Sequence, residues 1–226
     1  MKKALRYIFL AILTVIVVAW GSEAFRTHHR VEVGGTTLCI PKQYELHVNL
    51  PFLWFADGFD EDAAGGLYLI PAEEIAASVK GFTVSHINQH NVNYKHDITG
   101  IIWAKSQLGV PDGLAREAWK VLETEHGTSK HNKSLGLYEL GDGRFMHRWW
   151  HFAEALPKQN GNVFSKDWYV GHCSGVKPIN FRCRRMLEYE SVVFDYHIQA
   201  QDIPLREEIA LFLKSKFESW AENCRS

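Results

Sequence analysis

The sequence predicts an α+β fold: a mostly antiparallel sheet with packed helices, preceded by one N-terminal transmembrane or signal helix. Three observations lead to this fold class. A basic and then apolar segment opens the chain, strand-like runs follow one another with few helical runs between them, and an amphipathic run closes the chain. Strands that are neighbours in sequence and joined by short turns pair antiparallel, so this order of runs predicts α+β rather than α/β.

The first residues have the pattern of an export signal. A basic head of Lys2, Lys3 and Arg6 precedes the run 7–20, which is apolar apart from one threonine. Such a head before an apolar block is typical of export signals, and a bilayer span needs at least about 17 apolar residues. Segment 1–24 is therefore an uncleaved signal anchor or a cleaved signal peptide; the basic head disfavours a buried core helix. The expected anchor residues are Tyr7, Leu10, Ile12, Val15, Val18 and Trp20.

Export would place the rest of the chain outside the cytoplasm. With an uncleaved anchor, the body is periplasmic and held at the inner membrane; with cleavage at a small-x-small site such as 19–21 or 22–24, it is free in the periplasm. Residues 25–30 are expected to be a linker. Residues 31–226 have a length that suits one domain, so we expect a single α+β periplasmic domain.

The first half of this body predicts a hairpin and a strand–helix unit. Gly34 and Gly35, between β-branched flanks, predict the tight turn of a hairpin that starts at Val31. The run from Leu67 reads as a strand followed by a short helix, with Pro71 at the first helical position. Further elements are expected at three ranges: strands at 82–94 and 98–105, and a helix at 111–127.

The second half predicts more strands and a closing helix. The run from Met186 has apolar residues on both faces, which predicts one central strand covered on one side by helix. Asp202 as a cap and Pro204 in the first turn predict the start of the last helix, with Trp220 at the edge of its apolar face. Strands are also expected at 135–140, 144–152 and 167–173, and the helix should pack through Leu205, Ile209, Phe212, Leu213 and Phe217.

Composition and motifs exclude several classes of function. The chain has a net charge of −1, and its first thirty residues carry five Lys or Arg and one Glu, so the remainder is at −5. Nucleic-acid binding needs a basic face, so no nucleic-acid partner is expected. There is no G-x-S-x-G, phosphate loop or dinucleotide fingerprint. We therefore predict no cofactor and no catalytic residue from motifs.

Twelve histidines raise the question of a metal site. His86, His90 and His96 lie close together in sequence, but the residues among them favour a strand or loop over a helix. On a strand, positions four apart are about 13 Å from each other, too far to share one ion. His147 and His151 fail on the same spacing, so no metal ligand is predicted.

The four cysteines predict disulfides rather than a thiol site. An even count in an exported body implies bridges, with three possible connectivities. Gly175 and Pro178 supply turn residues inside one cysteine pair, so two adjacent strands could bring that pair together. His172 is adjacent to a cysteine, but neighbouring strand residues point to opposite faces. The predicted pairs are Cys173–Cys183 and, by elimination, Cys39–Cys224; Arg182, Arg184 and Arg185 are expected as surface charge.

Two segments are possible partner-binding surfaces. The run 54–66 places aromatic residues among acidic ones, as recognition loops do when an aromatic anchor is surrounded by charge. Its possible partner-binding residues are Trp54, Phe55, Asp57, Phe59, Asp60, Glu61 and Asp62. The alternative for this run is a solvated loop whose aromatic rings fold into the core. The second possible surface is the segment 158–169.

Several strings of this chain resemble a known group of exported proteins. They are the N-terminal apolar segment, the hairpin GGTTLCIP, a cysteine pair ending in CRR, the strand ESVVFDYHI and a closing helix. This layout is similar to that of small exported Gram-negative proteins found beside type VI secretion effectors, including immunity proteins for phospholipase effectors. The resemblance implies a protein that binds a toxin in the periplasm, often at its active-site entrance, and so protects the producer and its siblings.

The expected function is therefore binding. The sequence predicts a periplasm-facing, membrane-tethered binding protein, with a cognate toxin as partner and the membrane contacted through the N-terminal helix. An exported hydrolase or other envelope enzyme of unfamiliar type is the first alternative. An envelope assembly component is the second.

Overall fold

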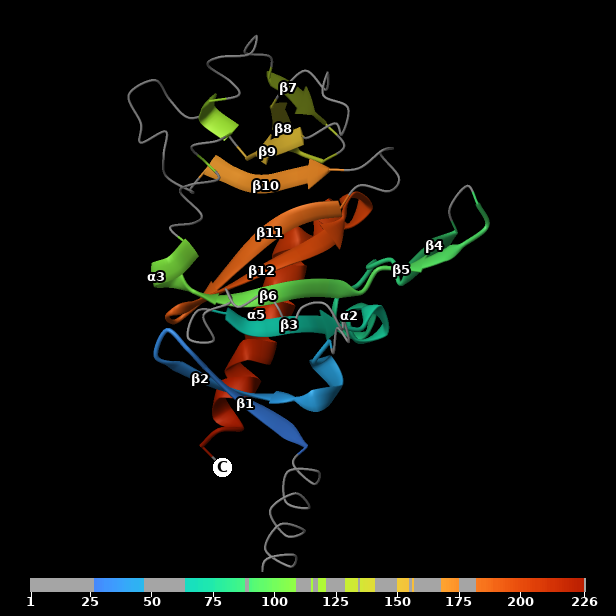
Figure 1. Ribbon diagram of the computed structural model, residues 1–226. Helices are drawn as coiled ribbons and strands as arrows, with labels where there is room; N and C mark the ends of the chain where they lie inside the picture. Colours follow the sequence, from blue (N-terminus) through green and yellow to red (C-terminus); the bar gives the residue numbers. More distant parts are fainter. Residues whose placement is uncertain are drawn as a thin grey trace, which may run out of the picture.

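An eight-stranded sheet crossed by one long helix forms the centre of the protein (Figure 1). All strand pairings among the described residues are antiparallel, in agreement with the predicted α+β class. The computed structural model describes residues 27–46, 64–87, 90–108, 115, 118–120, 129–133, 135–140, 150–154, 156, 168–174 and 182–225.

The large sheet has the order β3-β6-β12-β11-β10-β9-β8-β7. Neighbours in the second half of the chain are also neighbours in the sheet, whereas β6 inserts beside β12 from the first half. Its strands are β3 (Ala64–Ile70), β6 (Ile98–Ala104), β7 (Ser129–Asn132), β8 (Leu137–Leu140), β9 (Trp150–Ala153), β10 (Tyr169–Ser174), β11 (Arg182–Tyr189) and β12 (Val192–Gln199).

The single central strand predicted from Met186 is wrong, because the chain turns within it. Glu190 adopts a left-handed conformation with φ of 49°, and Tyr189 pairs directly with Val192 across the turn. The run thus forms two antiparallel strands, β11 and β12. The turn contains neither Gly nor Pro, and apolar residues continue on both sides of it, so the hydrophobic pattern shows no interruption.

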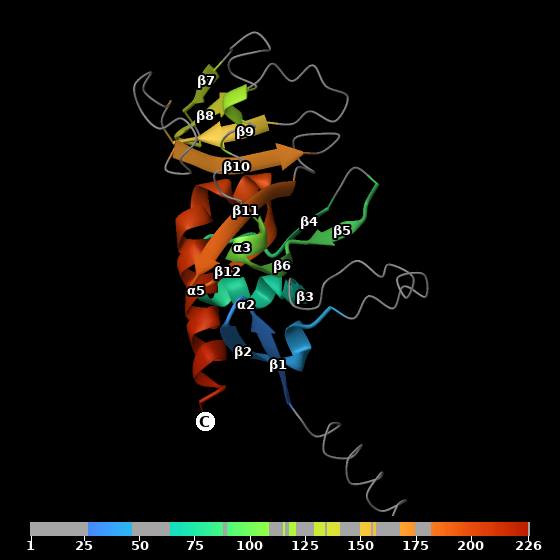
Figure 2. The same cartoon turned by 60° about the vertical axis from the view of Figure 1, so that its left-hand side comes forward.

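Two small hairpins flank the large sheet. β1 (His28–Val33) and β2 (Thr36–Pro41) are joined at Gly34 and Gly35, whose φ values of 57° and 85° match the predicted tight turn. η1 (Lys42–Tyr44) follows. The strand predicted at 82–94 is instead a second hairpin, of β4 (Ser85–Ile87) and β5 (Asn93–Lys95). It projects from the body in both Figure 1 and Figure 2.

The helices pack on the sheet and the first hairpin. α2 (Ala72–Ser78) begins one residue later than predicted, because the carbonyl of Pro71 accepts its first hydrogen bonds. α3 (Lys105–Leu108) follows β6 directly. The chain is also helical at Ala115 and at 118–120, within the predicted helix 111–127. The last helix, α5 (Arg206–Glu222), runs along one face of the sheet and down to β1–β2 (Figure 2).

The start of α5 differs from the prediction in two ways. The 3-10 helix η5 (Ala200–Leu205) precedes it, so Asp202 lies inside η5 and does not cap α5. Trp220, expected at the edge of the apolar face, is only 2% exposed and contacts the ring of Phe217 at 5.0 Å between centroids. Its indole fills the space between α5 and Tyr44, so it belongs to the core.

The buried residues form two clusters on the one continuous sheet. The larger cluster lies between α5, the β1–β2 hairpin and strands β3, β6 and β12, and it contains Phe194, Tyr196 and Phe217. The smaller cluster lies on β8 and β9 and contains Leu140 and Trp168. No helix in the part of the chain described above is long and apolar enough to cross a membrane. The predicted anchor 7–20 falls outside that part.

Candidate functional site

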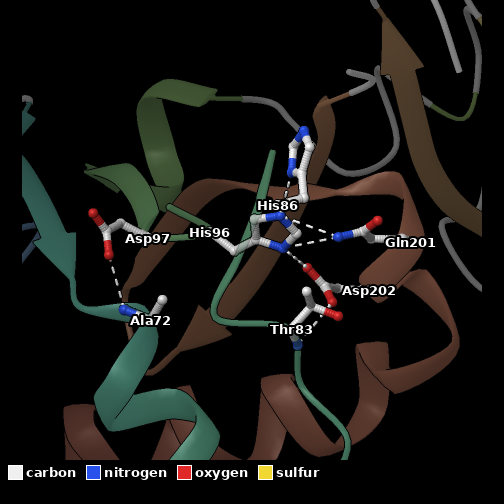
Figure 3. Close-up of polar contacts among 7 residues, drawn as sticks. All are labelled: Ala72, Thr83, His86, His96, Asp97, Gln201 and Asp202. Atoms are coloured by element: carbon white, nitrogen blue, oxygen red, sulfur yellow. Dashed lines mark hydrogen bonds and ion pairs between the residues drawn. The ribbon is translucent and has the colours of Figure 1, made fainter. Parts of the chain in front are cut away.

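Three polar side chains contact one another in sequence, from His86 on β4 through His96 to Asp202 on η5 (Figure 3). Nδ1 of His96 is 2.9 Å from Oδ2 of Asp202, and Nε2 of His96 is 2.7 Å from Nδ1 of His86. The amide nitrogen of Gln201 lies 3.1 Å from Nε2 of His96. The line thus runs from a buried carboxylate through one imidazole to a second, and we call Asp202, His96 and His86 the Asp–His–His relay.

Backbone hydrogen bonds position the members of the relay, which come from distant parts of the chain. His96 follows β5, and its backbone N–H donates to the carbonyl of Val84 at 2.9 Å, which returns the chain beside β4. His86 lies on β4 opposite Tyr94. Asp202 comes from η5, more than a hundred residues later, and its Oδ1 accepts from the backbone N–H of Thr83 at 3.4 Å.

The inner part of the relay is removed from water. His96 is 2% exposed and Asp202 is 1% exposed. Burial raises the pKa of Asp202, and the hydrogen bond from His96 acts in the opposite direction. A buried carboxylate beside an imidazole fixes the orientation of that ring, since the ring N–H must donate to it.

Two cross-strand pairs line a pocket of about 100 Å³ at the outer end of the relay. His86 and Tyr94 face each other across the hairpin, with ring centroids 5.8 Å apart in a stacked arrangement. Arg182 and Gln199 face each other at the end of the β11–β12 ladder that lies farthest from the turn at Glu190. Nε2 of His86 is buried and has no hydrogen-bond partner among the described residues.

This arrangement can orient an imidazole as a proton acceptor and bind an anion beside it. A relay that ends on an imidazole nitrogen can accept a proton there, and the guanidinium of Arg182 can hold an anion beside it. None of the four lining residues is a Ser, Thr, Cys or Lys that could act as a nucleophile. The geometry therefore fits proton exchange with a bound ligand and a binding role.

The relay was missed in the sequence because of the strand predicted at 82–94. A continuous strand would keep His86 and His96 far apart, whereas the hairpin turn brings them together. The sequence signal for the turn was the polar run 88–91. This run ends at Asn91, which adopts φ of 58°, a conformation that asparagine tolerates. Within the described ranges, no three His, Cys, Asp or Glu residues are grouped so as to hold a metal ion. His90 lies exposed in the turn.

The cysteines form the two predicted pairs. Cys39 and Cys224 are bridged with a Cα–Cα distance of 5.2 Å, and Cys173 and Cys183 with one of 3.9 Å. The second pair sits directly opposite in the β10–β11 ladder. His172 is itself buried, so the neighbouring imidazole is part of the packed sheet.

The predicted surface role of the arginines beside Cys183 holds only for Arg182, which is exposed. Arg184 donates to both carboxylate oxygens of Asp195 on the adjacent strand, with the shortest contacts at 2.8 and 2.6 Å. The side chain of Arg185 is 12% exposed and lies 3.6 Å from Glu207 of α5. Alternation along β11 turns Arg185 toward α5, where a long side chain can be covered and still reach a carboxylate.

The predicted partner-binding residues between Trp54 and Asp62 lie outside the described residues. Of the second segment, 158–169, only the last two residues are described. Trp168 is 6% exposed and belongs to the smaller core cluster. At this end the segment contributes to the core rather than to an exposed surface.

No protein-family model, no curated protein and no solved structure matches this chain. The assignment of a function therefore depends on its own residues and their geometry.

Proposed function

We propose that this chain is an exported binding protein, held at the inner membrane with its body in the periplasm, that neutralises a secreted antibacterial lipase effector. The observation that carries the proposal is the pairing of all four cysteines into two disulfides. Disulfides persist in oxidising compartments and are rare in the cytosol. Together with the export pattern of segment 1–24, they support a site of action in the cell envelope.

A disulfide-stapled domain also suits neutralisation of a toxin. The Cys39–Cys224 bridge spans 185 residues and ties β2 to the end of α5, which in the chain-entropy model stabilises the fold by about 5 kcal/mol. A stable inhibitor needs an interface of about 800 Å² on each partner, and a rigid scaffold reduces the entropy lost when that interface forms. The resemblance to exported immunity proteins supports the same class of partner.

Co-expression with the effector encoded beside its gene tests this proposal. The effector is directed to the periplasm of a sensitive strain, with and without this chain, and survival is counted. We expect survival only when the chain is present. The matched control is the same chain without residues 1–24, which should not protect because it stays in the cytoplasm. Equal killing in the presence and absence of the exported chain would refute the immunity function.

An exported envelope hydrolase is a second candidate, and the Asp–His–His relay is the observation that favours it. A buried carboxylate that orients a histidine is the supporting half of many hydrolytic sites. The test is a screen of the purified chain on lipid and peptidoglycan substrates, beside its His86→Gln variant. Turnover by the parent chain that His86→Gln abolishes would establish this candidate, whereas turnover in neither preparation would eliminate it.

A further inference from the structure

The pocket at the end of the Asp–His–His relay has the charge of an anion site. Among its described lining residues, His86, Tyr94, Arg182 and Gln199, only Arg182 carries a permanent charge, and none is a carboxylate. Arg182 makes no ion pair with a described residue, whereas Arg184, two positions along β11, is neutralised by a carboxylate at 2.6 Å. An arginine with a free guanidinium at a pocket can hold two oxygens of a carboxylate or phosphate.

Two further polar groups line the pocket. Gln199 is only 9% exposed, and its side-chain amide can donate to a ligand there. Nε2 of His86 is buried and has no hydrogen-bond partner within the described part of the chain. Buried polar groups are almost always hydrogen-bonded, and leaving one without a partner costs free energy. Both groups line the same pocket as Arg182, so one ligand could satisfy all three.

The proton positions along the relay determine which kind of anion the pocket can bind. An ionised Asp202 requires a proton on Nδ1 of His96, so Nε2 of a neutral His96 is an acceptor. Nδ1 of His86 must then carry a proton and donate to it, which leaves Nε2 of His86 as an acceptor. The described lining thus presents the cation of Arg182 and an acceptor at Nε2 of His86. A ligand that pairs with both groups needs an anionic oxygen and an O–H group on the same small molecule.

We propose that this pocket binds a singly protonated phosphate group, as inorganic phosphate or as a phosphomonoester. In this arrangement Arg182 holds the anionic oxygens, the amide of Gln199 donates to one of them, and the phosphate O–H donates to Nε2 of His86. A volume of about 100 Å³ accepts a phosphate group but is well below the roughly 300 Å³ of pockets for larger ligands. The inference is independent of the proposed toxin partner.

The proton requirement separates phosphate from its closest analogue. Inorganic phosphate carries at least one O–H at neutral pH, and a phosphomonoester, whose second pKa is near 6, carries one in part. Sulfate has the same shape and charge but no proton under these conditions. It would place an anionic oxygen against the lone pair of His86. The relay therefore predicts a preference for phosphate that a simple positive patch would not show.

Titration calorimetry on the full chain, with its disulfides intact, measures this preference. We expect inorganic phosphate to bind with one-to-one stoichiometry and sulfate to bind about tenfold or more weakly. Nitrogen NMR of the imidazoles should show the resonance of Nε2 of His86 shifting on addition of phosphate. Glycerol phosphate, the head of a phosphomonoester lipid, forms a second arm. Tighter binding of glycerol phosphate would identify a monoester ligand, and tighter binding of inorganic phosphate would identify the free ion.

Two variants locate the binding site. Arg182→Gln should weaken phosphate binding about tenfold or more, while Arg30→Gln, the same change at an exposed arginine of β1, should leave it unchanged. His86→Gln should still bind phosphate but lose the preference over sulfate, because an amide can donate as well as accept. Equal affinity for sulfate and phosphate in the parent chain, or an unchanged affinity in Arg182→Gln, would overturn the proposal.

Discussion

At the scale of single residues, His96 shows how buried hydrogen bonds keep the candidate site in place. It is almost fully buried, yet both of its ring nitrogens have partners. A buried imidazole without them would be costly, and a protonated one would need a counter-ion. Asp202 meets both needs: its carboxylate accepts from the neutral ring and would balance the charge of the protonated one. The same contact therefore stabilises the fold and orients His86 toward the pocket.

Replacing Asp202 by Ala and by Asn should distinguish the contribution of its hydrogen bond to stability from the contribution of its charge. Asp202→Ala removes the acceptor for His96 and should lower the free energy of unfolding by about 2 to 3 kcal/mol, because a buried N–H is left unpaired. Asp202→Asn keeps an oxygen for His96 and should cost clearly less than the alanine variant. Urea unfolding of both variants checks this order. Equal losses would show that the carboxylate charge, rather than the hydrogen bond, is what stabilises the site.

His197 should make stability depend on pH. Burial lowers its pKa, with Asp195 acting in the opposite direction, while an unfolded histidine titrates near 6.5. Between the folded and unfolded pKa values the unfolded chain binds the extra proton, so stability is lost as the pH falls from about 6.5 toward the folded value. We expect His197→Gln to show a smaller loss between pH 7 and pH 5 than the parent chain. Urea unfolding at several pH values measures the difference, and identical slopes would contradict the prediction.

At the scale of elements, the β4–β5 hairpin depends on the body for its order. Two-stranded hairpins are marginal by themselves, and this one exposes the side chains of Ile87 and Tyr94. The contacts that hold it include the relay, whose inner part is buried, and an exposed pair between Lys95 and Glu73. Since the pocket lies between this hairpin and the end of β11–β12, the ordering of the hairpin also determines the shape of the pocket.

Hydrogen exchange should reveal this dependence. His96→Ala should increase exchange of the amides between Ser85 and Lys95 by tenfold or more, with little change in the central strand β12, because local opening then costs less free energy. Lys95→Ala is the matched control and should have little effect, since exposed ion pairs contribute little. Uniformly faster exchange across the hairpin and β12 would show instead that His96 stabilises the whole fold.

At the scale of the whole molecule, the sequence predicts those structural features that depend on neighbouring residues. The β1–β2 hairpin follows from its paired glycines, the helix α5 from its apolar periodicity, and the antiparallel pairing from the succession of strands. The cysteine pairs follow from an even count and one short loop. Each of these predictions needs only residues that are close in sequence, or elimination among very few possibilities.

The features that were missed depend on distant contacts or on unusual turns. The turn at Glu190 contains no Gly or Pro, so the run on either side of it reads as one strand. Asp202 resembles a helix cap by position, and only its contact with His96, 106 residues away, shows another role. The relay also needs the hairpin turn before β5. No local pattern contains this information, because the partners meet only after the sheet and η5 have formed.

The two disulfides should differ in what they contribute to the whole fold. The Cys39–Cys224 bridge closes 185 residues and the Cys173–Cys183 bridge only 10, so the chain-entropy model gives losses of about 5 and about 3 kcal/mol on their removal. Urea unfolding of the Cys39→Ala/Cys224→Ala and Cys173→Ala/Cys183→Ala variants measures both. We expect the first to be the less stable. Mass mapping of non-reduced peptides from the exported protein provides the control, and a link between Cys39 and Cys173 would contradict both the pairing and this order.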